Sequence, residues 1–461
     1  MTSAVGEKLN LLSAAEASRL IGAREITATE LLQDCFEQIH RLDAELKAWV
    51  HLDPEISFAE ARAVDEKIKS GSRPGRLVGV PVGVKDIYNT RDMPTQMGSP
   101  IWKNFTPGND ARVVHSMRMA DAIVAGKTTT AEFAVHAPAP TGNPHNPLYM
   151  PGTSSSGSAV AVAAYMVPVA LGTQTAGSTL RPASYCGIYG FKPSFGIIPR
   201  TGMLKTTDSL DTVGFFARSV NDLEIMFDVL RVRGADYPLS DAALSDSSRQ
   251  NKGPRPWRIG LVRGPKWNDA EPYAQQALIR FAHDLSEEPD MIVSEIDLAE
   301  SFSRAHDIHG VIYDKTLSYY FKNEFRQHTL ISPIMYEIVT RGNQVRVEQY
   351  QRALEDQSAI ASEFDSLMME YDAILTLTTG GAAFEGLDRV DRPDNCLIWT
   401  LCGAPAVNLP VFQDDKKMPF GAQLVARRYN DILLLGLLHA LREKEIIPSE
   451  TNPHPSLAGH S

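Results

Sequence analysis

Residues 151–194, PGTSSSGSAVAVAAYMVPVALGTQTAGSTLRPASYCGIYGFKPS, place two runs of small hydroxyl and glycine residues on either side of an apolar segment. The first run centres on Ser154 and the second on Ser178. Glycine lets the backbone approach a ligand closely, and serine supplies a nucleophile. Because Thr-Ala-Gly precedes Ser178 at the end of an apolar strand candidate, consecutive backbone N–H groups there can face a developing oxyanion. An isolated run of this kind is more often a turn, so the rest of the chain must decide.

Short β-rich runs alternate with helical sequence along the whole chain, which predicts an α/β fold with a large mixed sheet. In the first half they are LVGVPVGV from Leu77, AIVAG from Ala122 and VPVALGTQT from Val167. In the second half they are WRIGLV from Trp257, MIVSEI from Met291, AILTLT from Ala373, AVNLPVF from Ala406 and GAQLVA from Gly421.

Helix signals lie at both ends of the chain. Ser13 and Thr27 are each followed three residues later by Glu, the reciprocal arrangement that opens helices, so we expect two or three N-terminal helices covering the sheet. Near the other end, Asn430 is expected to cap a helix with five leucines on one face. Residues 234–256 are rich in Asp, Ser, Pro and Gly and predict an irregular surface connection.

The bulk composition is that of a globular protein with an acidic balance. The 461-residue chain is 43% apolar and 22% charged, so it can bury a large core. Its formal net charge of −11 argues against a nucleic-acid partner, since neutralising phosphates needs clustered Lys and Arg. The apolar run over 159–171 contains Pro168 and is too short to span a bilayer, and the N-terminal sequence lacks a signal-peptide pattern. We therefore expect a cytoplasmic protein with no membrane partner.

Lys85 supplies a second candidate group, because it ends the apolar run that starts at Leu77. Strand alternation directs Lys85 and Asp86 to opposite sides. For a lysine to act as a base near neutrality, its pKa must fall from about 10.4 by roughly 3, which requires about 4 kcal/mol of desolvation or positive neighbours. Taken alone, Lys85 is more often a solvated lysine at a strand end.

Together, these groups resemble the amidase signature family of serine hydrolases. Ser154 follows Lys85 by 69 residues and precedes Ser178 by 24, within glycine-serine runs like those of that family. The resemblance extends over 79–194 at motif level and more loosely to about Gly436.

The resemblance implies a role for each matched residue. Ser178 is the expected nucleophile, Lys85 the ultimate base, and Ser154, after a cis peptide bond, the proton relay between them. The expected oxyanion hole is formed by backbone N–H groups, those of Thr175, Ala176, Gly177 and Ser178. This chemistry needs no metal or organic cofactor, and four cysteines without C-x-x-C spacing predict buried thiols rather than a zinc site or disulfides.

The resemblance also implies the fold and the domain organisation. We expect a three-layer α/β/α sandwich around a large mixed, twisted β-sheet. A single amidase domain over 1–461 is expected to have N-terminal helices over 1–75, a signature core over 76–233, a second half over 257–447 and a polar tail over 448–461. Residues 264–394 are the expected source of the substrate-pocket loops.

Five positions differ from the residues or spacing that are usual in the family's motifs. Thr153 and Ser156 stand where glycines are usual, and a β-branched Thr restricts the backbone before Ser154. Gln174 replaces a frequent aspartate and Ala176 a glycine, but the N–H donors belong to the backbone and are kept. Arg181 lies three residues after Ser178 instead of two, and an anchoring ion pair is favoured for it over a substrate contact.

Weaker signals receive structural interpretations. DAIVAGKT over 121–128 lacks the first glycine of a phosphate-binding loop. His306 and His309 have helical spacing but no evident third ligand, so ordinary histidines are favoured over a metal site. An aromatic cluster is favoured as core rather than pocket: Tyr313, Tyr319, Tyr320, Phe321 and Phe325. Trp399 and Cys402 match a region near the acyl pocket of relatives only loosely.

The sequence thus predicts an amidase that hydrolyses a small-molecule carboxylic amide through an acyl-serine intermediate. Two alternatives stay open: a glutaminase-type subunit of a transamidating complex, and a hydrolase of urea-like or carbamoyl substrates. The aspartate replaced by Gln174 is usual in the glutaminase type, which favours a stand-alone hydrolase. General frequencies of oligomers favour a homodimer.

Overall fold

The computed structural model describes residues 8–234 and 238–451, and within them eleven strands form one mixed sheet. Its strand order is β1-β3-β2-β4-β6-β5-β10-β11-β9-β7-β8. The strands are β1 (Trp49–Leu52), β2 (Pro81–Lys85), β3 (Ile123–Thr128), β4 (Val169–Gln174), β5 (Tyr189–Lys192), β6 (Thr212–Ala217), β7 (Trp257–Leu261), β8 (Met291–Glu295), β9 (Ala373–Leu377), β10 (Ala406–Gln413) and β11 (Pro419–Val425).

The sheet combines two parallel parts with an antiparallel centre. β2 pairs in parallel with β3 and β4, and β7 pairs in parallel with β8 and β9, while β4, β6, β5, β10, β11 and β9 pair antiparallel in turn. The α/β architecture and the eight predicted strands are confirmed. Three strands were not predicted from the sequence: β1, β5 and β6, the first two of which are only four residues long. Strands from both halves of the chain join the sheet, and the expected single domain stays a prediction.

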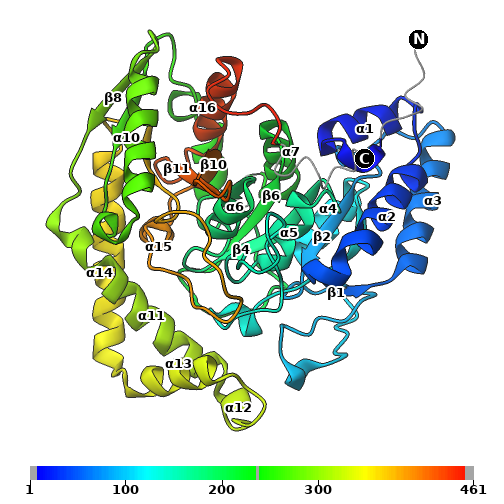
Figure 1. Ribbon diagram of the computed structural model, residues 1–461, viewed down its shortest axis with the longest axis horizontal. Helices are drawn as coiled ribbons and strands as arrows, with labels where there is room; N and C mark the ends of the chain where they lie inside the picture. Colours follow the sequence, from blue (N-terminus) through cyan, green and yellow to red (C-terminus); the bar gives the residue numbers. More distant parts are fainter. Residues whose placement is uncertain (1–7, 235–237, 452–461) are drawn as a thin grey trace.

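Helices accompany the strands along the chain and pack on the sheet. They are α1 (Ala14–Gly22), α2 (Ala28–Leu46), α3 (Pro54–Lys69), α4 (Arg112–Met119), α5 (Ser156–Ala163), α6 (Leu180–Cys186), α7 (Val220–Leu230), α8 (Pro238–Ser245), α9 (Ser247–Gln250), α10 (Pro272–Ser286), α11 (Ala305–Tyr320), α12 (Lys322–Phe325), α13 (Pro333–Gln344), α14 (Val347–Leu367), α15 (Cys396–Leu401) and α16 (Asp431–Glu443). Figure 1 shows α1–α3 on one side of the molecule, with α10, α11 and α14 on the other.

The N-terminal helices begin as predicted. Ser13 caps α1, and Thr27 with Glu30 forms a full capping box at α2. The apolar stripe of α2 is buried against the sheet. α5 is buried along its whole length because its residues, SGSAVAVA, are small enough to pack on every face.

Two details differ from expectation. The 234–256 connection contains α8 and α9, so it is partly helical rather than irregular. Asn430 precedes α16, but its side chain accepts hydrogen bonds from Arg249 instead of capping the helix. Of the predicted polar tail, residues 452–461 lie outside the described residues.

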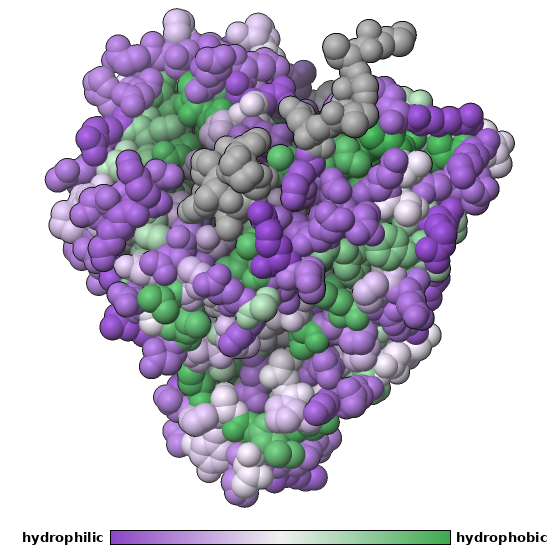
Figure 2. All heavy atoms as spheres, turned by 45° about the vertical axis from the view of Figure 1, so that its right-hand side comes forward, coloured by the Kyte–Doolittle hydropathy of each residue, from purple (hydrophilic) through white to green (hydrophobic). Residues whose placement is uncertain are grey.

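The surface carries small apolar patches between polar side chains on the face shown in Figure 2. All four cysteines are buried and free, as predicted. In the described parts of the chain, we find no helix with the length and apolar character needed to cross a membrane.

Candidate active site

Lys85 ends β2, a strand enclosed by β3 and β4. Its side chain is fully buried. This burial lowers the pKa of Lys85 well below the ordinary value for lysine, and the negative charge of Asp211 opposes that shift. Desolvation therefore favours the uncharged amine.

Three hydroxyl oxygens surround Lys85 Nζ. Ser154 Oγ and Thr173 Oγ1 each lie 2.8 Å away, and Ser155 Oγ lies 2.9 Å away. Ser155 donates its own proton to the carbonyl oxygen of Thr173 at 3.2 Å, so it accepts from Lys85. If Thr173 Oγ1 accepts the second N–H of a neutral amine, the nitrogen lone pair faces the hydroxyl of Ser154. The geometry suits a lysine that takes a proton from Ser154.

Ser154 is buried and follows a cis peptide bond from Thr153, as the family resemblance implies. Thr153, which replaces a common glycine, is also buried, and its hydroxyl donates to the carboxylate of Asp391. The departure from glycine is thus accommodated by a polar partner on a distant segment.

Residues 175–178 form the bend between β4 and α6. The carbonyl oxygen of Thr175 accepts a hydrogen bond from His309 Nε2 at 2.8 Å, and that of Ala176 accepts one from Thr400 Oγ1 at 2.7 Å. Thr175 Oγ1 donates to Asp211 at 2.8 Å. Across the described chain, the backbone N–H groups of 175–178 have no acceptor. Side chains thus hold the bend through its carbonyl oxygens and the Thr175 hydroxyl, while its backbone N–H groups stay available to a ligand.

Gln174 stabilises the same bend through contacts with the start of α6 and with Thr400. Its Oε1 accepts from the backbone N–H groups of Thr179 and Leu180, each at 3.0 Å, where α6 begins. Its Nε2 donates to Thr400 Oγ1 at 3.0 Å. Gln174 therefore caps the helix that follows Ser178 and orients the hydroxyl that holds Ala176.

Ser178 lines a cavity of about 430 Å³ together with Thr153, Thr175 and Ala176. Its remaining walls come from Arg181, the 134–136 loop, one face of α11, Arg341 and the 390–397 segment, so much of the wall lies within the predicted 264–394 region. Ser178 Oγ has no hydrogen-bond partner among the described residues. The structure thus places Lys85 and Ser154 in direct contact, whereas Ser178 faces the cavity without a hydrogen bond to either.

Arg181 anchors the loop that contains Ser178 to the 390–397 segment. Its guanidinium pairs with Asp391 and Asp394, each at 2.6 Å, and all three side chains are nearly buried. A Cβ on Gly177 would lie 2.7 Å from Arg181 Nη2, so an alanine there would displace a guanidinium that two carboxylates hold in place. The structural role favoured for Arg181 agrees with these contacts.

His306 and His309 bind backbone carbonyls. His306 Nε2 lies 3.0 Å from the carbonyl oxygen of Asp394, and burial lowers the pKa of both imidazoles, that of His309 to about 4. Within residues 8–234 and 238–451, no group of three or more His, Cys, Asp or Glu is arranged to hold a metal.

The aromatic cluster divides among the cavity wall, the core and the surface, so the expectation of core rather than pocket does not hold for Tyr313. Tyr313 lines the cavity and Phe321 packs in the core, whereas Tyr319 is 75% exposed. Trp399 and Cys402 are buried in the core and do not line the cavity.

Several contributors were missed from the sequence. Ser155 and Thr173 were detectable as hydroxyl residues near the predicted catalytic positions, because both lie within residues 151–194. Asp211, Asp391 and His309 gave no such signal, since only folding brings them to residues 153–181.

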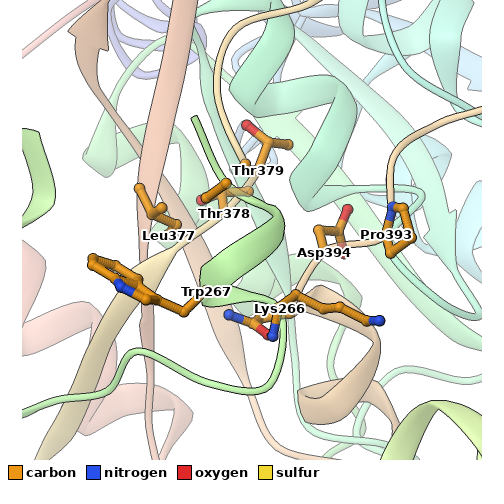
Figure 3. A pocket seen from close by; sticks show the side chains of 10 residues that line it. Lys266, Trp267, Leu377, Thr378, Thr379, Pro393 and Asp394 are labelled. Carbon is orange, nitrogen blue, oxygen red and sulfur yellow. The ribbon is translucent and has the colours of Figure 1, made fainter. Parts of the chain in front are cut away.

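A second, much smaller pocket lies beside Asp394 (Figure 3). It is lined by Lys266, Trp267, Thr378 and Thr379 among others, and its volume is about 10 Å³. That is about the space one water molecule needs, so this pocket is too small for a substrate. The candidate substrate site is the 430 Å³ cavity, because Ser178 lines it.

Comparisons with known proteins agree with this architecture. The chain is 30% identical to a glutamyl-tRNA(Gln) amidotransferase subunit of Carboxydothermus hydrogenoformans, over 95% of this chain and 98% of that protein. The peptide amidase of Stenotrophomonas maltophilia superposes with a TM-score of 0.81 at 25% identity, over 96% of this chain and 98% of the other. A structure of a vestigial complex concerned with the origin of an s-triazine catabolic enzyme gives a TM-score of 0.84 at 25% identity, over 95% and 100%. A model of the amidase family matches residues 30–435, and the chain therefore belongs to the amidase family.

Proposed function

We propose that this protein hydrolyses a carboxylic amide to an acid and an amine, with Ser178 as nucleophile, Ser154 as proton relay and Lys85 as base. The observation that carries the proposal is the buried Lys85 amine, 2.8 Å from Ser154 and surrounded by hydroxyls. A desolvated lysine without a buried carboxylate in contact has little reason to stay charged. Membership of the amidase family supports the same reaction class.

In the proposed acylation step, Ser178 Oγ attacks the amide carbonyl carbon while its proton passes to Ser154 Oγ. Ser154 simultaneously transfers its own proton to Lys85 Nζ, which becomes an ammonium. The carbonyl π electrons move to oxygen, and the resulting oxyanion accepts hydrogen bonds from backbone N–H groups of 175–178. The unpaired state of those groups supports this role.

Collapse of the tetrahedral intermediate breaks the C–N bond. The proton returns from Lys85 through Ser154 to the departing nitrogen, which leaves as a neutral amine. Water then attacks the acyl-serine, gives its proton to the same relay and releases the carboxylic acid with Ser178 restored. The relay requires Ser178 Oγ to reach hydrogen-bond distance of Ser154 when substrate is bound.

Labelling with a fluorophosphonate followed by peptide mass mapping tests the assignment. We expect one adduct on Ser178 in the wild-type protein, none in Ser178→Ala, and much slower labelling in Lys85→Met. Ser184→Ala is the matched control, because Ser184 is a buried serine of α6 that does not line the cavity. An adduct on another serine of folded protein would refute the assignment.

A second candidate function is that of one component of a transamidating complex. It is favoured by the 30% identity to an amidotransferase subunit over nearly the whole chain. Gln174, in place of the usual aspartate, favours the stand-alone hydrolase. Ammonia release from a panel of amides, hydrazides and ureas by the purified chain alone separates the two, and glutamine as the sole substrate would favour the transamidating component.

A further inference from the structure

His309 joins α11 to the bend that precedes Ser178. Its Nε2 lies 2.8 Å from the carbonyl oxygen of Thr175. Because a carbonyl only accepts, Nε2 carries the ring proton. Burial lowers the pKa of His309 to about 4, so the ring is neutral near pH 7 and this tautomer is its resting form.

The orientation of the His309 ring is held at a second point. It stacks on Tyr313, with ring centroids 5.6 Å apart and planes inclined by 22°. Both residues belong to α11, one turn apart, so the helix fixes their spacing. The donor nitrogen therefore has little freedom to leave Thr175.

The hydrogen bond also determines where a neighbouring N–H points. A trans peptide unit is planar, and its C=O and N–H point in opposite directions. Holding the Thr175 carbonyl against His309 turns the Ala176 N–H away from the imidazole. Thr400 holds the next peptide unit in the same manner, through the carbonyl of Ala176.

We propose that His309 is a positioning residue for the reaction: through the Thr175–Ala176 peptide it aims the Ala176 N–H at the oxyanion formed when Ser178 attacks. This inference rests on the proposed function. Under this proposal, His309 stabilises the transition state more than the bound substrate, because the oxyanion exists only after attack.

The expected signature is a loss in turnover without a matching loss in substrate affinity. Removing a whole oxyanion donor costs about 10²–10³ in kcat, and a misdirected donor costs less, so we expect a decrease of about 10- to 100-fold. His309→Phe keeps the ring stack on Tyr313 but removes the donor. His309→Gln restores an N–H that can reach the Thr175 carbonyl.

The experiment measures kcat and KM for an aryl amide, together with the affinity for an aryl boronic acid, which becomes tetrahedral on a catalytic serine. For His309→Phe we expect kcat and boronic acid affinity to fall together by about 10- to 100-fold, with KM changed by less than about threefold. We expect His309→Gln to recover at least half of the loss on a logarithmic scale. His306→Leu is the matched control: it alters the same cavity without touching the bend, so boronic acid affinity and KM should change by similar factors.

Three outcomes would overturn the inference: unchanged kcat in His309→Phe, equal losses in KM and boronic acid affinity, or no advantage of Gln over Phe. Should His309→Phe not fold, His309→Leu takes its place in the same comparison. Ser178→Ala separates this inference from the function on which it rests. If that variant still turns over, the proposed function fails; if it is inactive while His309→Phe equals wild type, only the role of His309 fails.

Discussion

Replacing Gln174 with leucine should destabilise the fold and slow the reaction, because its side chain serves both α6 and the bend before Ser178. The substitution removes the acceptor of two buried N–H groups, those of Thr179 and Leu180, and the donor to Thr400. Each buried N–H left without a partner costs about 1–3 kcal/mol, or about 2–6 kcal/mol for the pair. The gain from a more apolar side chain offsets part of this, so we expect the free energy of unfolding to fall by about 3 kcal/mol.

Urea unfolding, followed by circular dichroism and tryptophan fluorescence, measures this loss. The midpoint should fall while the m-value stays constant, because the surface exposed on unfolding is unchanged. The matched control is Gln423→Leu in β11. Gln423 is equally buried, but it donates one hydrogen bond, to the Leu377 carbonyl, and its Oε1 has no partner in the described chain. We expect a loss of about 1 kcal/mol or less for that control.

Gln174→Leu should also lower kcat, since Thr400 loses the amide that orients its hydroxyl toward Ala176. Gln174→Glu separates the two tasks, because it keeps the acceptor for α6 and loses the donor to Thr400. We expect it to lose less stability than Gln174→Leu and still lower kcat. The reasoning is refuted if Gln174→Leu is within about 0.5 kcal/mol of wild type, or no less stable than Gln423→Leu.

Four further predictions concern Lys85, the proposed base, and the loop around Ser178. Because burial lowers the pKa of Lys85 and the neutral amine is the proposed base, kcat/KM should rise with pH through that pKa and then level off, which a pH–rate profile measures; a rate that falls over the same range contradicts it. In the unfolded chain Lys85 keeps its proton up to about pH 10.4, whereas the folded protein loses it at a lower pH. Between these two pH values, the free energy of unfolding of wild type should therefore rise relative to that of Lys85→Met, which urea titrations at several pH values measure. In Gly177→Ala the new Cβ would lie 2.7 Å from Arg181 Nη2, so we expect the free energy of unfolding to fall by about 1–3 kcal/mol and kcat to decrease. A variant with the unfolding temperature and kcat of wild type would exclude the clash. Arg181→Met should cost about 3–5 kcal/mol by leaving Asp391 and Asp394 buried without their cation, with Asp391→Asn in the same background recovering part of the loss in urea unfolding.

The sequence was most informative about features that depend on residues close together in the chain. Apolar runs bounded by Gly and Pro predicted eight strands and the mixed α/β sheet, because strand patterning depends on neighbours in the chain. β1 and β5 were missed because four residues carry too little periodicity to distinguish strand from loop. Asn430 was misinterpreted because a capping residue and a partner for a distant arginine have the same local sequence.

By itself, the sequence determined the family motifs, the spacing of Lys85, Ser154 and Ser178, and the acidic globular character of the chain. Only the tertiary structure decided what surrounds those residues. Asp391 on Thr153, Thr400 on Ala176 and His309 on Thr175 are separated from their partners by between 134 and 238 positions. The physical reason is that desolvation of the Lys85 amine and the aim of backbone N–H groups depend on packing between distant segments, which no local pattern encodes.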